Sequence, residues 1–394
     1  MTDLKRRLNV IESQSFPAYV VWELTLLCDH ACTHCGSRAG KPRNNELSTI
    51  QALEIVKQLK DMGTQEIVLI GGEAYLHPGF IDIIKAIKKA NIRPVMTTGG
   101  FGITPSLAHQ MAEAGLQRAS VSIDGTDVIH DQLRHKKGSF LRAIQALRHL
   151  KQAGIAIAAN TQINSLNLAN IEALYNILIQ EQVTSWQVQI TAPLGRAADN
   201  PEILLQPNDL LHLMPQLANL KRRGREHGLL LMLGNNLGYF GPDEGLLRSQ
   251  NAEASDHFRG CQAGRFVLGI ESNGDVKGCP SLQSAYISGN LTKNNLDTIW
   301  QSPSLGFTKQ RSVSELWGFC AQCDFKEVCM GGCSFTAHAL FGKRGNQPYC
   351  YHRASQLKKQ GLRERLVKKH PAIGQPFDHG LFEIITETIG PVSY

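Results

Sequence analysis

The 394-residue sequence has no cysteine between residues 36 and 260, and it has no apolar run of the length that a membrane span needs, roughly 18 residues. Its first residues, MTDLKRRLNVIESQSF, lack the apolar segment of a secretory signal. Charged residues make up 19% and apolar residues 42%, which permits a sizeable core and argues against wholesale disorder. We therefore expect a soluble, cytoplasmic protein with no membrane partner.

Basic residues are in modest excess, with a net charge of +7, and they gather in two runs, LKRRGREHG at 220–228 and KKQGLRERLVKKH at 358–370. No aromatic residues interleave with these runs as they do in nucleic-acid-binding modules, so no nucleic-acid partner is expected. Two interpretations remain for each run: a solvated helix face, or a surface that attracts an acidic partner segment.

Apolar runs alternate with helical patterns from about residue 18 to residue 225. Strands are expected at 18–26, 66–72, 93–99, 119–125, 155–163 and 185–190. Helices are expected at 48–63, 78–90, 106–115, 139–154 and near 170–180, the first opening with a Ser48–Gln51 capping box. Six such steps of about 30 residues predict an α/β fold of parallel strands joined by right-handed crossovers, with enough chain for most of a (β/α)8 barrel.

Polar and glycine-rich motifs follow each of these strands. They are the three cysteines at 28–35, then GGEAY at 71–75, TTGG at 97–100, SIDG at 122–125, NTQIN at 160–164 and TAPLGRA at 191–197. The carboxyl ends of parallel strands carry the chemistry of barrels and open sheets alike. All six sets are therefore expected at one rim.

The three thiols after the first strand, Cys28, Cys32 and Cys35, have the spacing C-x3-C-x2-C. Because a closed zinc site needs four ligands, a zinc interpretation requires His30, His34 or a distant residue as the fourth. Four thiolates usually hold a [4Fe–4S] cluster, so three leave one iron with an open position.

C-x3-C-x2-C after the first strand of a parallel β/α series resembles the signature of the radical S-adenosylmethionine (radical SAM) superfamily, over about 200 residues. The resemblance implies a partial (β/α)6 TIM-like barrel and a [4Fe–4S] cluster whose open iron binds S-adenosyl-L-methionine. Its reductive cleavage would then release a 5′-deoxyadenosyl radical. The same resemblance implies cofactor-binding roles for His34, Gly71, Gly72, Glu73, Thr97, Thr98, Ser122, Asp124, Arg134 and Asn160. Glu73 would accept from the methionine ammonium, and Arg134 would pair with the methionine carboxylate.

The remaining seven cysteines lie at 261–350 in the pattern C-x12-G-x4-C, C-x2-C-x5-C-x3-C, C. This order resembles the SPASM extension of radical SAM enzymes. It implies two auxiliary [4Fe–4S] clusters, an outer one on Cys320, Cys323, Cys329 and Cys350 and an inner one on Cys261, Cys279 and Cys333. A zinc ribbon would explain CxxC pairs but not this layout.

The sequence thus predicts five segments: an N-terminal extension at 1–17, the radical SAM core at 18–225, a linker at 226–260, the SPASM domain at 261–353 and a C-terminal tail at 354–394 with a basic helix. The resemblance favours an oxidoreductase that modifies a ribosomally made precursor peptide by oxidation, crosslinking or epimerisation. Expected partners are that peptide, an electron donor such as flavodoxin or ferredoxin, and a separate leader-binding protein. A small-molecule or cofactor-pathway enzyme on the same scaffold is the alternative, and a non-catalytic metal protein a third.

Overall fold

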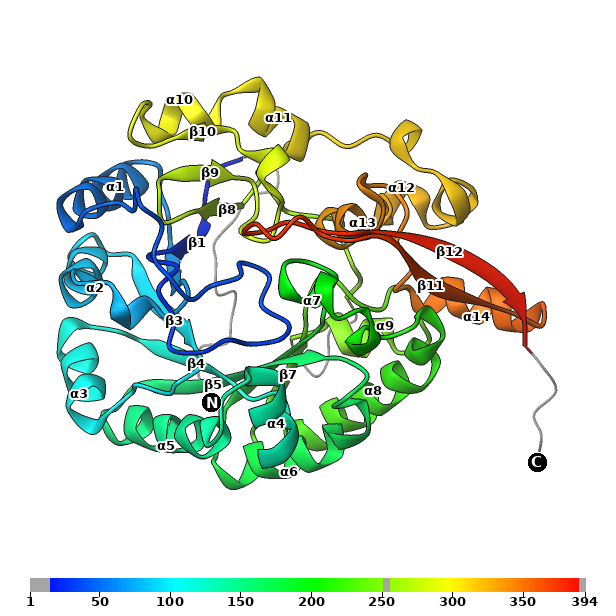
Figure 1. The fold of residues 1–394 in the computed structure, drawn as a ribbon, viewed down its shortest axis with the longest axis horizontal. Helices are drawn as coiled ribbons and strands as arrows, with labels where there is room; N and C mark the ends of the chain where they lie inside the picture. The colour runs from blue at the N-terminus through cyan, green and yellow to red at the C-terminus, as the bar shows by residue number, and fades with distance from the viewer. Residues whose placement is uncertain (1–14, 251–255, 390–394) are drawn as a thin grey trace. The chain divides into compact units, whose positions relative to one another are not determined.

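A computed structural model describes residues 15–250 and 256–389. The chain divides into two compact units, which are Met1–Asn160 with Gln262–Arg311 (unit 1) and Thr161–Cys261 with Ser312–Tyr394 (unit 2). Figure 1 labels the elements of both. Residues 1–14 of the expected N-terminal extension and residues 251–255 of the expected linker lie outside the described residues.

Unit 1 is built on a mostly parallel sheet with the strand order β10-β9-β8-β1-β2-β3-β4-β5. The strands are β1 Tyr19–Glu23, β2 Glu66–Ile70, β3 Arg93–Thr98, β4 Arg118–Ser122, β5 Ala156–Ile163, β8 Val267–Ile270, β9 Asp275–Lys277 and β10 Gly289–Asn290. Neighbours from β8 through β5 are parallel, and β9 and β10 are antiparallel additions. The strand β8 comes from the cysteine-rich half of the sequence, so that half completes the sheet beside β1.

The helices of unit 1 follow the predicted periodicity. They are α1 Thr49–Asp61, α2 Phe80–Lys89, α3 Pro105–Ala114, α4 Asp127–Arg134, α5 Ser139–Gln152, α10 Leu296–Trp300 and α11 Pro303–Lys309. The Ser48–Gln51 capping box starts α1 as expected, and Thr104 caps α3. Figure 1 shows α1, α2 and α3 side by side along the strands. Their apolar faces cover one side of the sheet and leave the strand ends to the loops.

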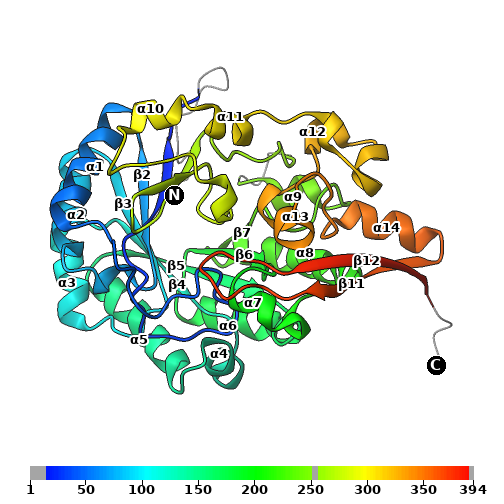
Figure 2. The same cartoon turned by 45° about the horizontal axis from the view of Figure 1, so that its top comes forward.

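Unit 2 holds two pairs of strands. They are the parallel pair β6 Ser185–Ile190 and β7 Leu230–Leu233, and the antiparallel hairpin β11 Leu362–His370 and β12 Leu381–Thr388. Its helices are α6 Ile171–Gln180, α7 Arg196–Asp199, α8 Leu210–Glu226, α9 Glu244–Arg248, α12 Lys326–Cys329, α13 Ser334–Phe341 and α14 Tyr351–Lys359. Figure 2 shows β11 and β12 running side by side as one ribbon.

Two local predictions are corrected by the structure. The segment 226–260, expected to be a linker, contains β7 and α9, because the apolar run at 229–233 pairs with β6. The basic helix expected near 357–369 ends at Lys359. Gly361 then adopts φ +72°, and residues 362–370 form β11, since Leu362, Glu364 and Leu366 alternate toward one face.

The basic runs are largely neutralised within unit 2. Lys221 is buried and donates to the Leu247 carbonyl at 2.8 Å, and burial lowers its pKa to about 7. Arg363 and Arg365 both pair with Glu387 across the hairpin. These pairings favour the solvated-face interpretation over a free basic surface.

The described helices include none that is both long and apolar enough to cross a membrane. The α/β class, the mostly parallel sheet and the cysteine-rich region after it agree with the predicted fold.

Candidate active site

The cysteine loop after β1 is held by backbone bonds to the loop after β2. Gly72 donates to the Thr25 carbonyl at 2.7 Å and Glu73 donates to the Leu27 carbonyl at 2.8 Å. A Cβ at Gly72 would collide with the Leu27 carbonyl, and one at Gly71 with that of Thr25. The two glycines therefore let the loop that carries Glu73 lie directly against the loop that carries the thiols.

Cys28, Cys32 and Cys35 are free thiols, as are the other seven cysteines. The His30 amide donates to the Cys28 sulfur at 3.4 Å, and Arg134 Nη1 lies 3.8 Å from the Cys32 sulfur. Burial raises the pKa of both thiols, and the neighbouring cysteines add to this for Cys28. Such thiols become thiolates when a cation offsets their charge, and amide and guanidinium donors suit sulfur that ligates iron.

A mixed set of donor atoms from the cysteine loop and the loop after β2 bears on the zinc alternative. Donor atoms of Cys28, Asp29, His30 and Glu73 lie within 4.8 Å of one another. However, both His30 nitrogens are used, Nδ1 by Asp29 at 2.7 Å and Nε2 by Ser139 at 3.0 Å. Hydrogen bonds therefore already occupy the imidazole that this site would need.

Glu73 is a buried carboxylate, 3% exposed, at the end of β2. Thr98 donates to one oxygen at 2.5 Å and the Gly99 amide to the other at 2.6 Å. Burial raises the pKa of Glu73 to about 7. No basic side chain of the described residues forms an ion pair with it. A cation placed beside this carboxyl group would stabilise its charged form, and an ammonium group is such a cation.

Arg134, Asp124 and His34 form a second buried group. Arg134 Nη2 donates to Asp124 Oδ2 at 2.5 Å, and His34 Nε2 approaches the same oxygen at 3.2 Å. Although burial alone would raise the pKa of Asp124, Arg134 and His34 hold it well below its usual range. Arg134 Nε and His34 Nδ1 are buried and bond no described residue. These two atoms are the polar groups left for a ligand.

Ser122 and Asn160 are register partners on β4 and β5. Asn160 lies within β5, three residues before its end, as the predicted strand at 155–163 implied. Thr98 contacts Glu73, whereas Thr97 is a half-buried neighbour on β3. The structure therefore brings Cys32, His34, Asp124 and Arg134 into one contact group, and Glu73 and Thr98 into another.

A chain of buried hydrogen bonds beside the cysteine loop was not predicted. His130 Nδ1 accepts from the Asp124 amide at 3.1 Å, so its Nε2 carries the proton and donates to Ser139 Oγ at 3.2 Å. The Ser139 hydroxyl then donates to His30 Nε2, and His30 Nδ1 donates to Asp29. Burial lowers the pKa of His130 to about 3, so this ring is neutral.

These hydrogen bonds connect the segment between Cys28 and Cys32 to Ser139, the first residue of α5. His30 and Ser139 are 109 residues apart, and no spacing motif joins them. The stretch that supplied Arg134, HDQLRHKKGSF, also contains His130 and Ser139, and this is the only signal the sequence offered.

In unit 2, four cysteines of the second group lie around one small pocket. Cys320, Cys323, Cys329 and Cys350 line it together with aromatic side chains that include Phe240, Phe319 and Phe325. Phe240 and Phe325 stack with centroids 4.2 Å apart. The Gln347 amide donates to the Cys320 sulfur at 3.4 Å, and burial raises the pKa of Cys320 and Cys350. Four thiols, an N–H···S bond and an apolar wall suit an iron–sulfur cluster.

The other three cysteines are divided between the units. Cys279 follows β9 in unit 1, and Cys261 and Cys333 belong to unit 2. The backbone N–H of Cys333 donates to the Tyr239 hydroxyl at 3.3 Å, and burial followed by the charge of Cys261 raises the pKa of Cys333.

The fold and the arrangement of the thiols are those expected of the radical SAM class of iron–sulfur proteins. Residues 22–176 match the family model described as the radical SAM superfamily, and residues 261–324 match that of SPASM, an iron–sulfur cluster-binding domain. The chain thus carries a radical SAM domain followed by a SPASM domain.

Curated relatives of two kinds are similar to this chain. AdoMet-dependent heme synthase of Methanosarcina barkeri (strain Fusaro / DSM 804) is 28% identical over 358 residues, which cover 87% of this chain and 99% of that protein. Mycofactocin maturase MftC of Mycobacterium ulcerans (strain Agy99) is 29% identical over 321 residues, which cover 80% of this chain and 83% of that protein.

Solved structures share the fold. Streptococcus suis SuiB bound to S-adenosylmethionine superposes with a TM-score of 0.66 at 19% identity, covering 87% of this chain and 78% of that one. The protein anSMEcpe, with bound AdoMet and the Kp18Cys peptide, gives a TM-score of 0.69 at 18% identity, covering 86% and 94%.

Proposed function

We propose that this protein is a radical SAM oxidoreductase that modifies a ribosomally synthesised peptide. Cys28, Cys32 and Cys35 would hold the [4Fe–4S] cluster. With S-adenosylmethionine bound, that group supplies a 5′-deoxyadenosyl radical for hydrogen abstraction. The observation that carries the proposal is the buried carboxylate of Glu73, which forms no ion pair with a described residue and lies on a loop that is hydrogen-bonded to the loop bearing the three thiols.

The polar groups of unit 1 would divide the binding of the methionine part. Glu73 would accept from its ammonium, as expected from the sequence. The predicted pairing of Arg134 with the carboxylate is modified by the structure, because Nη2 already binds Asp124. The Nε of Arg134, which bonds no described residue, would be available to the carboxylate. Asp124 would thus act by aiming the guanidinium rather than by touching the methionine.

The remaining predicted residues would complete the site on the adenosine side. The half-buried Ser122 and Asn160, adjacent on β4 and β5, would contact the ribose. His34 would lie near the adenine, where its ring is fixed by the bond to Asp124. Thr98 would act through Glu73, whose oxygen it binds, and the half-buried Thr97 would line the ribose side.

Two auxiliary clusters would serve the oxidative half of the reaction. The outer cluster would use the four cysteines that line the small pocket of unit 2, and the inner one Cys261, Cys279 and Cys333. In an oxidation, one electron remains on the substrate after hydrogen abstraction, and such clusters accept it. An electron donor such as flavodoxin or ferredoxin would return the enzyme to its reduced state. These partners and a cytoplasmic location belong to the same proposal.

The choice of a peptide substrate is supported by the similarity to mycofactocin maturases, which extends over 80% of this chain. The test is to incubate the reconstituted enzyme, reductant and S-adenosylmethionine with candidate precursor peptides. A peptide mass change that rises in step with 5′-deoxyadenosine supports the proposal. Cleavage of S-adenosylmethionine with every peptide unchanged would overturn the peptide assignment.

A tetrapyrrole substrate is the second candidate, because the similarity to the AdoMet-dependent heme synthase spans 99% of that protein. The same assay with iron-coproporphyrin in place of peptide distinguishes the two. A porphyrin mass change in step with 5′-deoxyadenosine would assign the enzyme to that class instead.

A further inference from the structure

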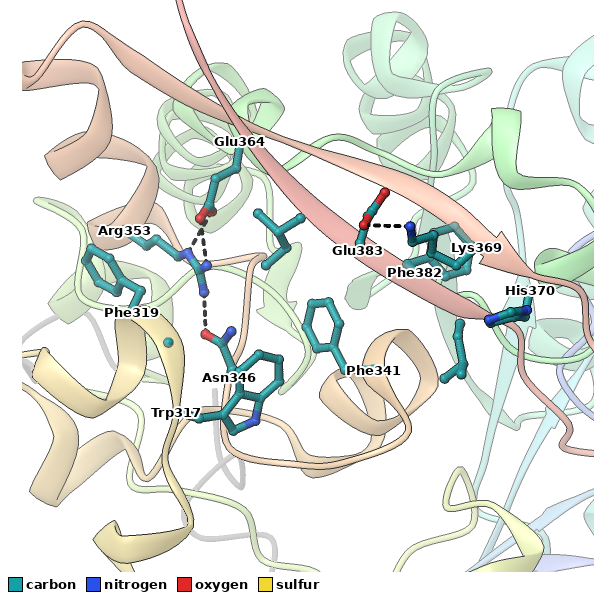
Figure 3. A pocket seen from close by; sticks show the side chains of 13 residues that line it. Trp317, Phe319, Phe341, Asn346, Arg353, Glu364, Lys369, His370, Phe382 and Glu383 are labelled. Atoms are coloured by element: carbon teal, nitrogen blue, oxygen red, sulfur yellow. Dashed lines mark hydrogen bonds and ion pairs between the residues drawn. The ribbon is translucent and has the colours of Figure 1, made fainter.

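The cavity between the β11–β12 hairpin and the segment around Trp317 has no role in the chemistry described above. It lies wholly in unit 2 and has a volume of about 700 Å³, within the range of ligand sites. Figure 3 shows Trp317, Phe341 and Phe382 around it, with Phe319 nearby. The rings of Trp317 and Phe341 meet edge to face at 5.2 Å, and both are only partly buried. The cavity thus exposes aromatic surface to whatever enters it.

The charges that line this cavity are already paired. Arg353 binds Glu364 through two bonds of 2.7 Å and donates to Asn346 Oδ1 at 2.6 Å. Lys369 pairs with Glu383 at 3.0 Å. The lining therefore offers no unpaired Lys or Arg of the described residues to a phosphate or a porphyrin carboxylate, and His370 is its remaining basic side chain. The Asn346 side chain is 2% exposed, and its amide nitrogen donates to no described residue (Figure 3). This donor is available to a carbonyl oxygen.

One edge of the hairpin beside the cavity is open. The Ile389 amide donates to the Gly361 carbonyl at 2.8 Å, which sets the register of the ladder. By the alternation of antiparallel pairs, the N–H groups of Ile384, Thr386 and Thr388 then point away from β11. They donate to no described residue, and Thr386 and Thr388 are exposed.

A hydrogen bond on the opposite edge of the hairpin agrees with this register. Leu366, the pairing partner of Ile384, donates its outward N–H to the Gln206 side chain at 2.8 Å. On the β12 edge these N–H groups form a row that bonds no described residue, and the row adjoins the cavity through Ile384. The natural partner of such an edge is another extended backbone.

From the open edge and the aromatic cavity we infer that β12 is a peptide-docking strand. An extended segment of the precursor peptide pairs with it and places alternate apolar side chains among Trp317, Phe341 and Phe382. This inference rests on the proposed action on a peptide, and it assigns recognition to this hairpin rather than to a separate leader-binding protein. Backbone bonds provide affinity, and the cavity selects apolar residues at every second position.

The experiment uses the full-length, cluster-loaded protein and fluorescent synthetic dodecapeptides in which Phe and Leu alternate with Ser. Binding is measured by fluorescence anisotropy without reductant. The control peptide has the same sequence with alternate backbone nitrogens methylated. The matched protein variants are Thr386→Pro, which removes one outward N–H, and Thr386→Ala, which keeps it. We expect N-methylation and Thr386→Pro each to raise the Kd at least about tenfold, and Thr386→Ala to change it less than about twofold.

Hydrogen exchange separates docking from unfolding of the hairpin. The Ile385 amide points into the hairpin, so it stays protected in an intact Thr386→Pro variant, whereas peptide binding slows exchange at Ile384 and Thr388 in the wild type. If Ile385 loses protection, Phe341→Ala replaces Thr386→Pro, and it should weaken binding at least about tenfold through the cavity.

Three outcomes would overturn the inference: no peptide binds saturably, N-methylation has no effect, or iron mesoporphyrin competes with every peptide and binds Thr386→Pro as tightly as wild type. Reductive cleavage of S-adenosylmethionine is assayed in parallel. Intact cleavage without peptide binding refutes the docking strand alone, and peptide binding without cleavage refutes the radical chemistry alone.

Discussion

Ser139→Ala tests the hydrogen-bonded chain that holds the cysteine loop. The hydroxyl links two imidazoles at 3.0 and 3.2 Å, and the His30 and His130 residues are 6% and 0% exposed. Its removal leaves the His130 N–H without an acceptor and the His30 nitrogen without a donor, in a place that water does not reach. An unsatisfied buried group costs about 1–3 kcal/mol, so two such groups predict a loss of about 2–6 kcal/mol in the free energy of unfolding.

The assay is urea unfolding of the full-length protein under anaerobic conditions, monitored by far-UV circular dichroism. Ser106→Ala is the control, because Ser106 is an exposed serine in the first turn of α3 with a single 3.5 Å side-chain contact, from Gln110. It should change stability by less than about 0.5 kcal/mol. In Ser139→Ala, amide exchange between residues 29 and 35 should also accelerate. The reasoning fails if Ser139→Ala is as stable as Ser106→Ala.

Three further predictions concern other parts of the molecule. Glu364→Gln leaves the buried Arg353 guanidinium without its carboxylate and should cost about 3–5 kcal/mol in chemical denaturation; a loss under 1 kcal/mol would contradict a buried ion pair. Burial, and then the nearby His379, lower the pKa of His338 to about 4. The free energy of unfolding should therefore be highest above pH 6.5 and fall by about 1–2 kcal/mol as the pH drops toward 4, after allowance for solvent screening. His338→Phe should reduce this pH dependence in a titration of stability against pH. Gly72→Ala drives a methyl group into the Leu27 carbonyl and should separate the two loops, which an anaerobic iron assay of the purified protein would register as lost iron; unchanged iron content would contradict it.

Sequence patterns were reliable where one feature decides the local structure. The buried strand β2 follows from its apolar run, and α1 from its capping box. The run KKQGLRERLVKKH was assigned to a helix because its charges suit an exposed helical face. Gly361 breaks that helix, and β12 supplies the ladder partner from about 20 residues further along, a pairing that no local propensity encodes.

The same limit applies to the site. Glu73 and Asp124 could be predicted because each follows a strand end at the expected rim. The pairing of Asp124 with Arg134 could not be predicted, because the resemblance assigned both side chains to the cofactor. Only the distance between them in the structure shows that they bind each other. The bond between His30 and Ser139 joins two loops whose approach depends on packing of the whole sheet.

The ring of Phe319 borders both the aromatic cavity beside the hairpin and the small pocket of the four cysteines. A side chain that enters the cavity beside Phe319 would contact a ring that also lines the pocket of the four sulfur atoms. Metal–sulfur centres change their electron affinity when water near them is displaced. Binding of the peptide would therefore change the reduction potential of a cluster held by these four cysteines. Electron transfer through that cluster would then depend on whether substrate is bound.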